Sequence, residues 1–286
     1  MKLTGRRTSV NVDDRRRSGG GKATGFSLLG LVVVGLLVWI TGGNPLEVLS
    51  GGGSDLISGG TSTPYVETPE DEELAQFSSQ ILAGTEDVWS QLFEQSGLTY
   101  EPPTLVIYSG ATRSGCGSAN GSTGPFYCSA DKAVYIDLSF FKDMKETLGA
   151  DGDFAYAYVI AHEVGHHVQY LLGTLAQVEN EKRGASEKEA NQLSVRLELQ
   201  ADFFAGIWAH YDNKRFQSME AGDIEEGLAA ATAIGDDRLQ KEARGYAVPD
   251  SFTHGTSKQR NAWLNKGYRT GDVSLGDTFS MAYSRL

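Results

Sequence analysis

His162, Glu163 and His166 have the types and the spacing of a hydrolytic metal site. They form a His-Glu-x-x-His pattern within residues 161–167. Residues four apart lie on one face of an α-helix, so both imidazoles can bind the same tetrahedral Zn²⁺. Glu163 lies one position round the helix, beside the open coordination site, where it can take a proton from water. The pattern therefore predicts a catalytic zinc centre with Glu163 as general base.

The residues ahead of this pattern predict a buried helix. Residues 154–161 are apolar on all sides, which is typical of a helix enclosed by the protein. Unpaired polar groups in such surroundings cost about 1–3 kcal/mol each, and a metal would supply the missing partners. A chance match on a surface helix is the alternative, and the apolar context argues against it.

Two histidines leave a catalytic zinc one protein ligand short. His167 is turned about 140° from His162 around the helix and cannot easily join the site. The better candidate is Glu198, which lies in a segment of helical periodicity and shares a face with Asp202. We expect Glu198 to bind the metal and Asp202 to accept the outer N–H of a ligand histidine. Two solvated acids on an exposed face are the alternative, but the apolar residues 203–208 indicate burial.

This arrangement resembles the gluzincin metallopeptidases, which carry His-Glu-x-x-His on one helix and Glu-x-x-x-Asp on a second. Residues 251–260 also resemble the Thr-His-Pro-x-Thr-x-x-Arg segment of membrane-associated gluzincins, with Gly255 in the place of the proline. The resemblance implies that His254 stabilises the oxyanion of the tetrahedral intermediate; an ordinary loop histidine is the alternative. It also implies a strand beside the cleft, to which an extended peptide can add.

Over nearly its whole length the sequence is similar to a bacterial family of neutral zinc metallopeptidases, the YpfJ-like proteins. The stretches that carry this similarity extend from the basic N-terminus to the His254 loop and include 5–7, 14–16, 124–128, 135–141, 162–169 and 198–202. The resemblance implies one Zn²⁺ per chain and a peptide or protein substrate. The rival hypothesis is a membrane-tethered binding or scaffold protein whose zinc site serves folding alone.

The N-terminal part of the chain predicts a membrane attachment. Residues 1–22 are basic, and residues 23–41 are uncharged and mostly apolar, which suits a cytoplasmic tail followed by one transmembrane helix. The positive charges precede this helix, so we expect the N-terminus in the cytoplasm and the catalytic domain outside the inner membrane. A cleaved signal peptide, a twin-arginine export signal and a basic nucleic-acid arm are weaker alternatives.

The remaining chain predicts one catalytic domain. Residues 42–64 are rich in glycine and serine and suit a flexible linker, so the domain should occupy residues 65–286. Candidate strands at 105–108 and 133–138 accompany long helical segments, and the second is the candidate for the strand beside the cleft. We therefore expect a helix-rich α+β zincin-like domain with a small β-sheet, preceded by one transmembrane helix.

Cys116 and Cys128 are the only cysteines of the chain. A pair in an exported domain predicts a structural disulfide, worth about 3 kcal/mol in the chain-entropy model; a Cys₂His₂ zinc site is the alternative.

The chain carries 25 basic and 37 acidic residues, and seven of the basic ones precede residue 23. So acidic a domain argues against nucleic acid as a partner.

Overall fold

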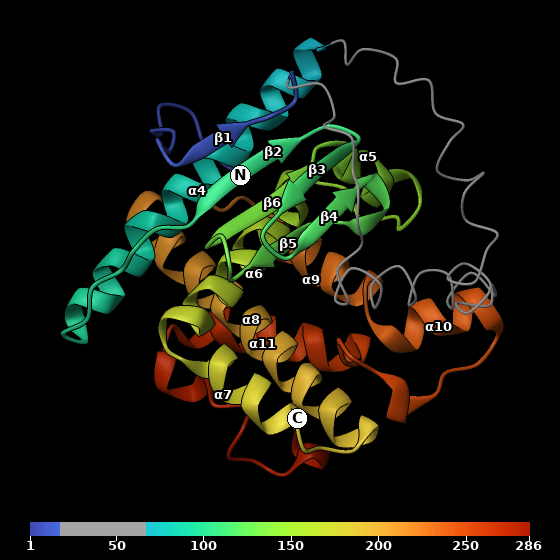
Figure 1. Ribbon diagram of the computed structural model, residues 1–286. Helices are drawn as coiled ribbons and strands as arrows, with labels where there is room; N and C mark the ends of the chain where they lie inside the picture. The colour runs from blue at the N-terminus through green and yellow to red at the C-terminus, as the bar shows by residue number, and fades with distance from the viewer. Residues whose placement is uncertain (18–66) are drawn as a thin grey trace.

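The computed structural model describes residues 1–17 and 67–286. The predicted membrane segment, 23–41, and the predicted linker, 42–64, lie outside the described residues. Among the helices of the two described ranges, none is both long enough and apolar enough to cross a membrane. The described part is a helix-rich α+β fold with two small sheets, as the sequence predicts (Figure 1).

Eight α-helices make up most of the described residues (Figure 1). In chain order they are α4 (Pro69–Gln95), α5 (Ser139–Glu146), α6 (Asp153–Leu171), α7 (Thr174–Lys182), α8 (Glu187–Phe216), α9 (Asp223–Ala233), α10 (Asp236–Arg244) and α11 (Ser257–Thr270). Three of them begin with capping boxes, formed by Thr68 with Asp71, Ser186 with Glu189, and Thr256 with Gln259. These boxes fix where α4, α8 and α11 start.

Four strands form the main sheet in the order β1-β2-β6-β5. They are β1 (Val12–Asp14), β2 (Thr104–Tyr108), β6 (Ala133–Asp137) and β5 (Phe126–Cys128), and only β5 is antiparallel to its neighbour. Both predicted strands are present, as β2 and β6. However, β6 is paired on both sides, so the prediction that an extended peptide adds to this strand is wrong. The edge strands of this sheet are β1 and β5.

A two-stranded hairpin of β3 (Ala111–Ser114) and β4 (Gly117–Asn120) stands beside the main sheet. The predicted disulfide is present and joins Cys116, in the turn of this hairpin, to Cys128 at the end of β5. It fastens the hairpin to β5. The alternative of a Cys₂His₂ zinc site is excluded, because neither cysteine is free.

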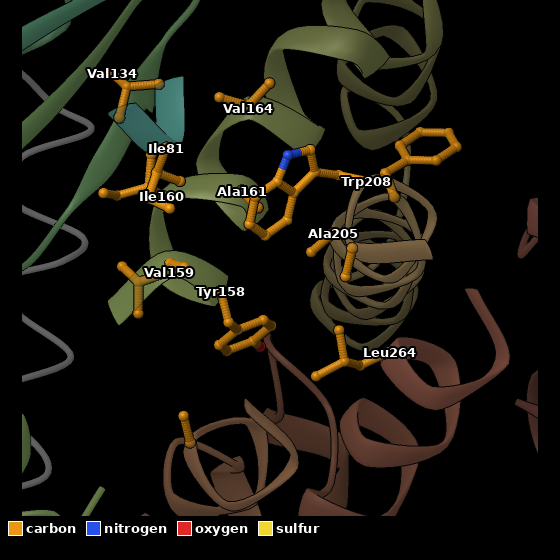
Figure 2. Packing of buried hydrophobic residues seen from close by; sticks show 14 of the residues in the cluster. Ile81, Val134, Tyr158, Val159, Ile160, Ala161, Val164, Ala205, Trp208 and Leu264 are labelled. Atoms are coloured by element: carbon orange, nitrogen blue, oxygen red, sulfur yellow. The ribbon is translucent and has the colours of Figure 1, made fainter. Parts of the chain in front are cut away.

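Helix α6 is enclosed between the sheet and α8, as its apolar sequence predicts. Figure 2 shows Ile160 beside Val134 of β6 and Ile81 of α4, while Trp208 of α8 lies on the other side of α6. Because α6 has neighbours on both sides, apolar residues occur all round it. Its two histidines and glutamate are therefore held on a helix with little freedom to move.

Helices α6 and α8 cross at very short range. A Cβ atom at Gly165 would lie only 2.9 Å from the carbonyl oxygen of Ala201. Glycine allows this approach because it has no side chain. The crossing brings Glu198 and Asp202 of α8 against His162 and His166 of α6.

Residues 1–17 pack against the domain and do not form the separate tail expected for residues 1–22. β1 pairs in parallel with β2, with Val12 opposite Leu105. A three-residue strand among charged residues gives no periodic signal. Its partner also lies far along the chain, so the sequence alone could not predict this pairing.

Candidate metal centre

Three side chains converge where α6 and α8 cross. The Nε2 atom of His162 lies 3.1 Å from one carboxylate oxygen of Glu198, and Nε2 of His166 lies 3.5 Å from the other. One ligand atom from each of the three residues lies within 4.8 Å of the others. Atoms bound to a tetrahedral zinc at about 2.0–2.1 Å are about 3.3 Å apart. The two distances from Glu198 to the histidines are thus close to those around a zinc ion.

The outer nitrogens of both histidines are held by hydrogen-bond acceptors. Nδ1 of His162 lies 2.8 Å from Asp202 Oδ1, and Nδ1 of His166 lies 2.9 Å from Gln169 Oε1. The Gln169 amide nitrogen donates to the Leu197 carbonyl at 2.7 Å, which turns its oxygen toward His166. Both Nδ1 atoms therefore carry a proton, so in each neutral imidazole the lone pair is on Nε2, the nitrogen that faces Glu198. This tautomer is the one that binds a metal.

Asp202 is placed as the sequence predicts, whereas the role of Gln169 was not foreseen. Its signal in the sequence is its position three residues after His166, on the same side of the helix. A glutamine at a fully buried position of an otherwise apolar helix also needs a partner. Together these two features could have indicated a supporting residue.

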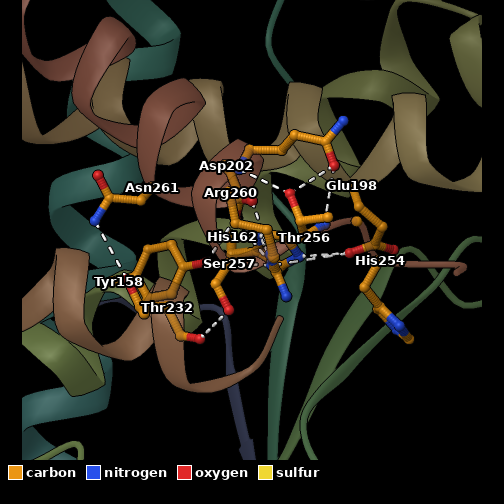
Figure 3. A network of polar contacts seen from close by, with 12 residues as sticks. Tyr158, His162, Glu198, Asp202, Thr232, His254, Thr256, Ser257, Arg260 and Asn261 are labelled. Atoms are coloured by element: carbon orange, nitrogen blue, oxygen red, sulfur yellow. Dashed lines mark hydrogen bonds and ion pairs between the residues drawn. The ribbon is translucent and has the colours of Figure 1, made fainter. Parts of the chain in front are cut away.

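Asp202 is the centre of a buried network that sequence reasoning also missed. Arg260 of α11 donates to both its oxygens, at 2.8 and 2.9 Å, and the Tyr158 hydroxyl donates to Oδ1 at 2.6 Å. Figure 3 shows these side chains gathered around His162. Burial would raise the pKa of Asp202, but Arg260 and His162 hold that pKa below its ordinary value. Asp202 therefore remains an ionised acceptor for His162.

The electrostatic field at the convergence point favours a cation. Burial would lower the pKa of His162, yet Asp202 and Glu198 outweigh it and raise that pKa to about 10. Burial would likewise raise the pKa of Glu198, but His166 and His162 hold it well below its usual range. Positive charge is strongly stabilised at this point, and a divalent cation would satisfy the same groups.

Glu163 lies next to this site without a protein partner. Its side chain is 9 % exposed. Over residues 1–17 and 67–286, no hydrogen bond or ion pair engages its carboxylate. A nearly buried carboxylate that is left free beside a metal-binding set is available to accept a proton from a bound molecule.

His254 has a defined orientation rather than that of a free loop side chain. Its Nδ1 lies 3.3 Å from Oδ1 of the buried Asp236, and Oδ2 of Asp236 accepts backbone N–H groups of the same loop, including that of His254. Burial works to lower the pKa of His254, but Asp236 and then Glu198 raise it. Gly255 has φ +92°, a conformation that proline cannot adopt, so this loop differs from the proline-containing pattern.

His167 does not join the metal site, in agreement with its predicted angle on the helix. Its Nε2 donates to the carbonyl oxygen of Glu101 at 2.6 Å, and its Nδ1 accepts from the Tyr127 hydroxyl at 2.9 Å. Tyr127 belongs to β5, so His167 links β5 to the helix that carries the metal-binding histidines. This link fixes the distance between strand and site.

We expect Asp202→Asn to weaken zinc binding by about 10- to 100-fold, because an amide accepts less strongly and no longer balances Arg260. A competition titration against a zinc chelator measures the affinity, and circular dichroism checks that the chain is folded. The matched control is Asp143→Asn, on the exposed side of α5. An unchanged affinity in the folded Asp202→Asn chain would remove Asp202 from the support of the site.

The site has the composition of a His-Glu-x-x-His site of the metallopeptidase class. It combines two histidines one turn apart on α6, a glutamate from the crossing helix and a free carboxylate beside them. The chain belongs to the neutral zinc metallopeptidase family: a family model described as "Putative neutral zinc metallopeptidase" matches residues 1–279. The family description names zinc, which agrees with a donor set of two imidazoles and one carboxylate.

Relatives match over most or all of the chain. "Uncharacterized protein YpfJ" of Escherichia coli (strain K12) is 51% identical over 98% of this chain and 99% of its own length. "Uncharacterized protein Rv2575" of Mycobacterium tuberculosis (strain ATCC 25618 / H37Rv) is 42% identical over 64% of each chain. No solved structure matches this chain significantly. The relatives thus support the family and leave the reaction to be argued from the site.

Proposed function

We propose that this protein is a zinc-dependent endopeptidase, with one zinc held by His162, His166 and Glu198. The observation that carries the proposal is the convergence of two correctly oriented Nε2 atoms and a carboxylate beside the unengaged Glu163. A zinc site that serves folding alone needs no free carboxylate next to it. A catalytic site needs one to move protons.

The residues divide the chemistry of amide hydrolysis among them. Zinc, when bound, supplies the Lewis acidity that activates water and polarises the scissile carbonyl. Glu163 accepts a proton from the attacking water and then passes it to the leaving nitrogen. His254, oriented by Asp236, donates a hydrogen bond to the carbonyl oxygen as that oxygen gains negative charge.

The edge strand β5 supports a peptide as the substrate. Among the described strands β5 has a single neighbour, β6, so its other edge presents unpaired backbone groups. An extended peptide can pair with such an edge. Because Tyr127 of β5 is hydrogen-bonded to His167 of α6, a peptide paired there would be held at a fixed position relative to the metal-binding histidines.

We also propose that residues 23–41 mediate contact with the membrane.

Turnover of peptides by the full chain tests this function. The zinc-loaded protein is incubated with a library of internally quenched peptides, before and after chelation and again after zinc is restored. We expect cleavage of internal peptide bonds. This cleavage should be lost when the metal is chelated and should return when zinc is restored. Stoichiometric zinc without cleavage of any peptide would favour the rival hypothesis of a structural zinc site.

A further inference from the structure

The N-terminal segment, residues 1–17, is an integral part of the fold. The backbone N–H of Leu105 donates to the carbonyl of Asn11 at 2.8 Å, and the N–H of Arg15 donates to the carbonyl of Ile107 at 2.7 Å. These bonds satisfy the edge of β2 that would otherwise be unpaired. Figure 1 shows β1 lying along β2 and beside α4.

Buried acids of the domain find their partners in this segment. Arg6 binds both oxygens of Asp212 on α8, at 2.6 and 2.8 Å, and Asp212 is fully buried. Glu86 of α4 is also buried and accepts from Arg7, Ser9 and Asn11. Within the described residues no other side chain pairs with either acid. Without the segment, both carboxylates would lose these partners, and a buried carboxylate is stable only when it is paired and hydrogen-bonded.

The two ends of the chain that flank residues 18–66 lie together. Arg17 forms an ion pair with Glu67, and Arg16 lies 3.3 Å from Glu67 and 3.1 Å from Glu72. Arg16 also donates to the backbone carbonyl of Asp71 at 2.9 Å. Residues 17 and 67, which bound the range 18–66, thus lie side by side.

We infer that the surface formed by α4 and α8 is the docking surface of the chain's own N-terminal segment, and that residues 1–17 and 67–286 lie on the same side of the membrane. Docking on two buried acids and a strand edge cannot occur across a bilayer. One crossing needs about 20 apolar residues and two need about 40, whereas the uncharged run at 23–46 has 24 residues.

This run is therefore too short to cross the membrane and return. With both of its flanks on one side, any contact it makes with the membrane begins and ends on that side. The inference replaces the expected orientation, in which a single crossing separates the N-terminus from the domain. It does not depend on zinc or on catalysis.

Cysteine labelling of the full chain in intact cells tests this inference. Val10 is 92% exposed in the N-terminal segment and Tyr246 is 60% exposed in the domain, so Val10→Cys and Tyr246→Cys are prepared separately. Each is treated with a membrane-impermeant maleimide before and after permeabilisation, and each signal is divided by that of the same variant unfolded in detergent. The chain without an added cysteine gives the background, because Cys116 and Cys128 are joined.

We expect the two variants to behave alike: both labelled in intact cells, or both labelled only after permeabilisation. Labelling of one before permeabilisation and of the other only afterwards would place them on opposite sides and overturn the inference. A Val10→Cys signal that matches Tyr246→Cys supports it whether or not the protein cleaves peptides, so this test and that of the proposed function can fail independently.

Discussion

Glu163→Gln is expected to lower the rate of peptide cleavage by at least about 10²–10⁴-fold while leaving the zinc content unchanged. Glutamine has nearly the shape of glutamate but cannot accept a proton at neutral pH. Glu163 makes no hydrogen bond or ion pair in the described part of the chain, so its replacement should not disturb the ligands. Cleavage of a quenched peptide and zinc analysis of the same preparation give the two readings.

The matched control is Glu179→Gln on α7, where the side chain is exposed. It makes the same chemical change away from the site and should retain full turnover. If Glu163→Gln also retained turnover, Glu163 would not be the base. If it lost zinc along with turnover, Glu163 would be acting on the metal site itself rather than on the proton.

Glu198→Ala is expected to abolish stoichiometric zinc binding, and with it all peptide cleavage. The substitution removes one of three donors and leaves the imidazoles of His162 and His166 as the remaining ligands. Two nitrogen ligands hold zinc far more weakly than a complete three-residue set. Zinc content after dialysis against a weak chelator measures the loss, and circular dichroism shows whether the variant is folded.

Glu94→Ala, on an exposed position near the end of α4, serves as the control and should keep its zinc. A folded Glu198→Ala chain that still carried one tightly bound zinc would show that the third ligand lies elsewhere. The rate of zinc exchange then separates this outcome from mere weakening of the site. If Glu198 is a ligand, its loss should make zinc exchange faster than in the unaltered chain.

The sequence predicted those parts of the site that repeat with the period of a helix. His162 and His166 lie four apart, and so do Glu198 and Asp202, because each pair shares one face of a single helix. The sequence indicates that the two helices meet only through the chemistry of zinc, because a zinc held by two histidines needs a third donor. The close crossing at Gly165 that realises it is a property of packing.

Other parts of the site depend on contacts between distant segments. The Arg260 guanidinium reaches Asp202 from α11, and nothing in the local sequence of either helix identifies the other as its partner. The strand at 133–138 was correctly predicted, but whether a strand is central or at the edge depends on pairing. That pairing placed β2 and β5 on its two sides.

The zinc content of the full chain, purified without added metal and without a His-tag, is the measurement to make first. We expect about one tightly held zinc per chain, lost in Glu198→Ala and retained in Glu163→Gln. A folded chain without stoichiometric metal would contradict it, because the convergence of His162, His166 and Glu198 would then not be a zinc site.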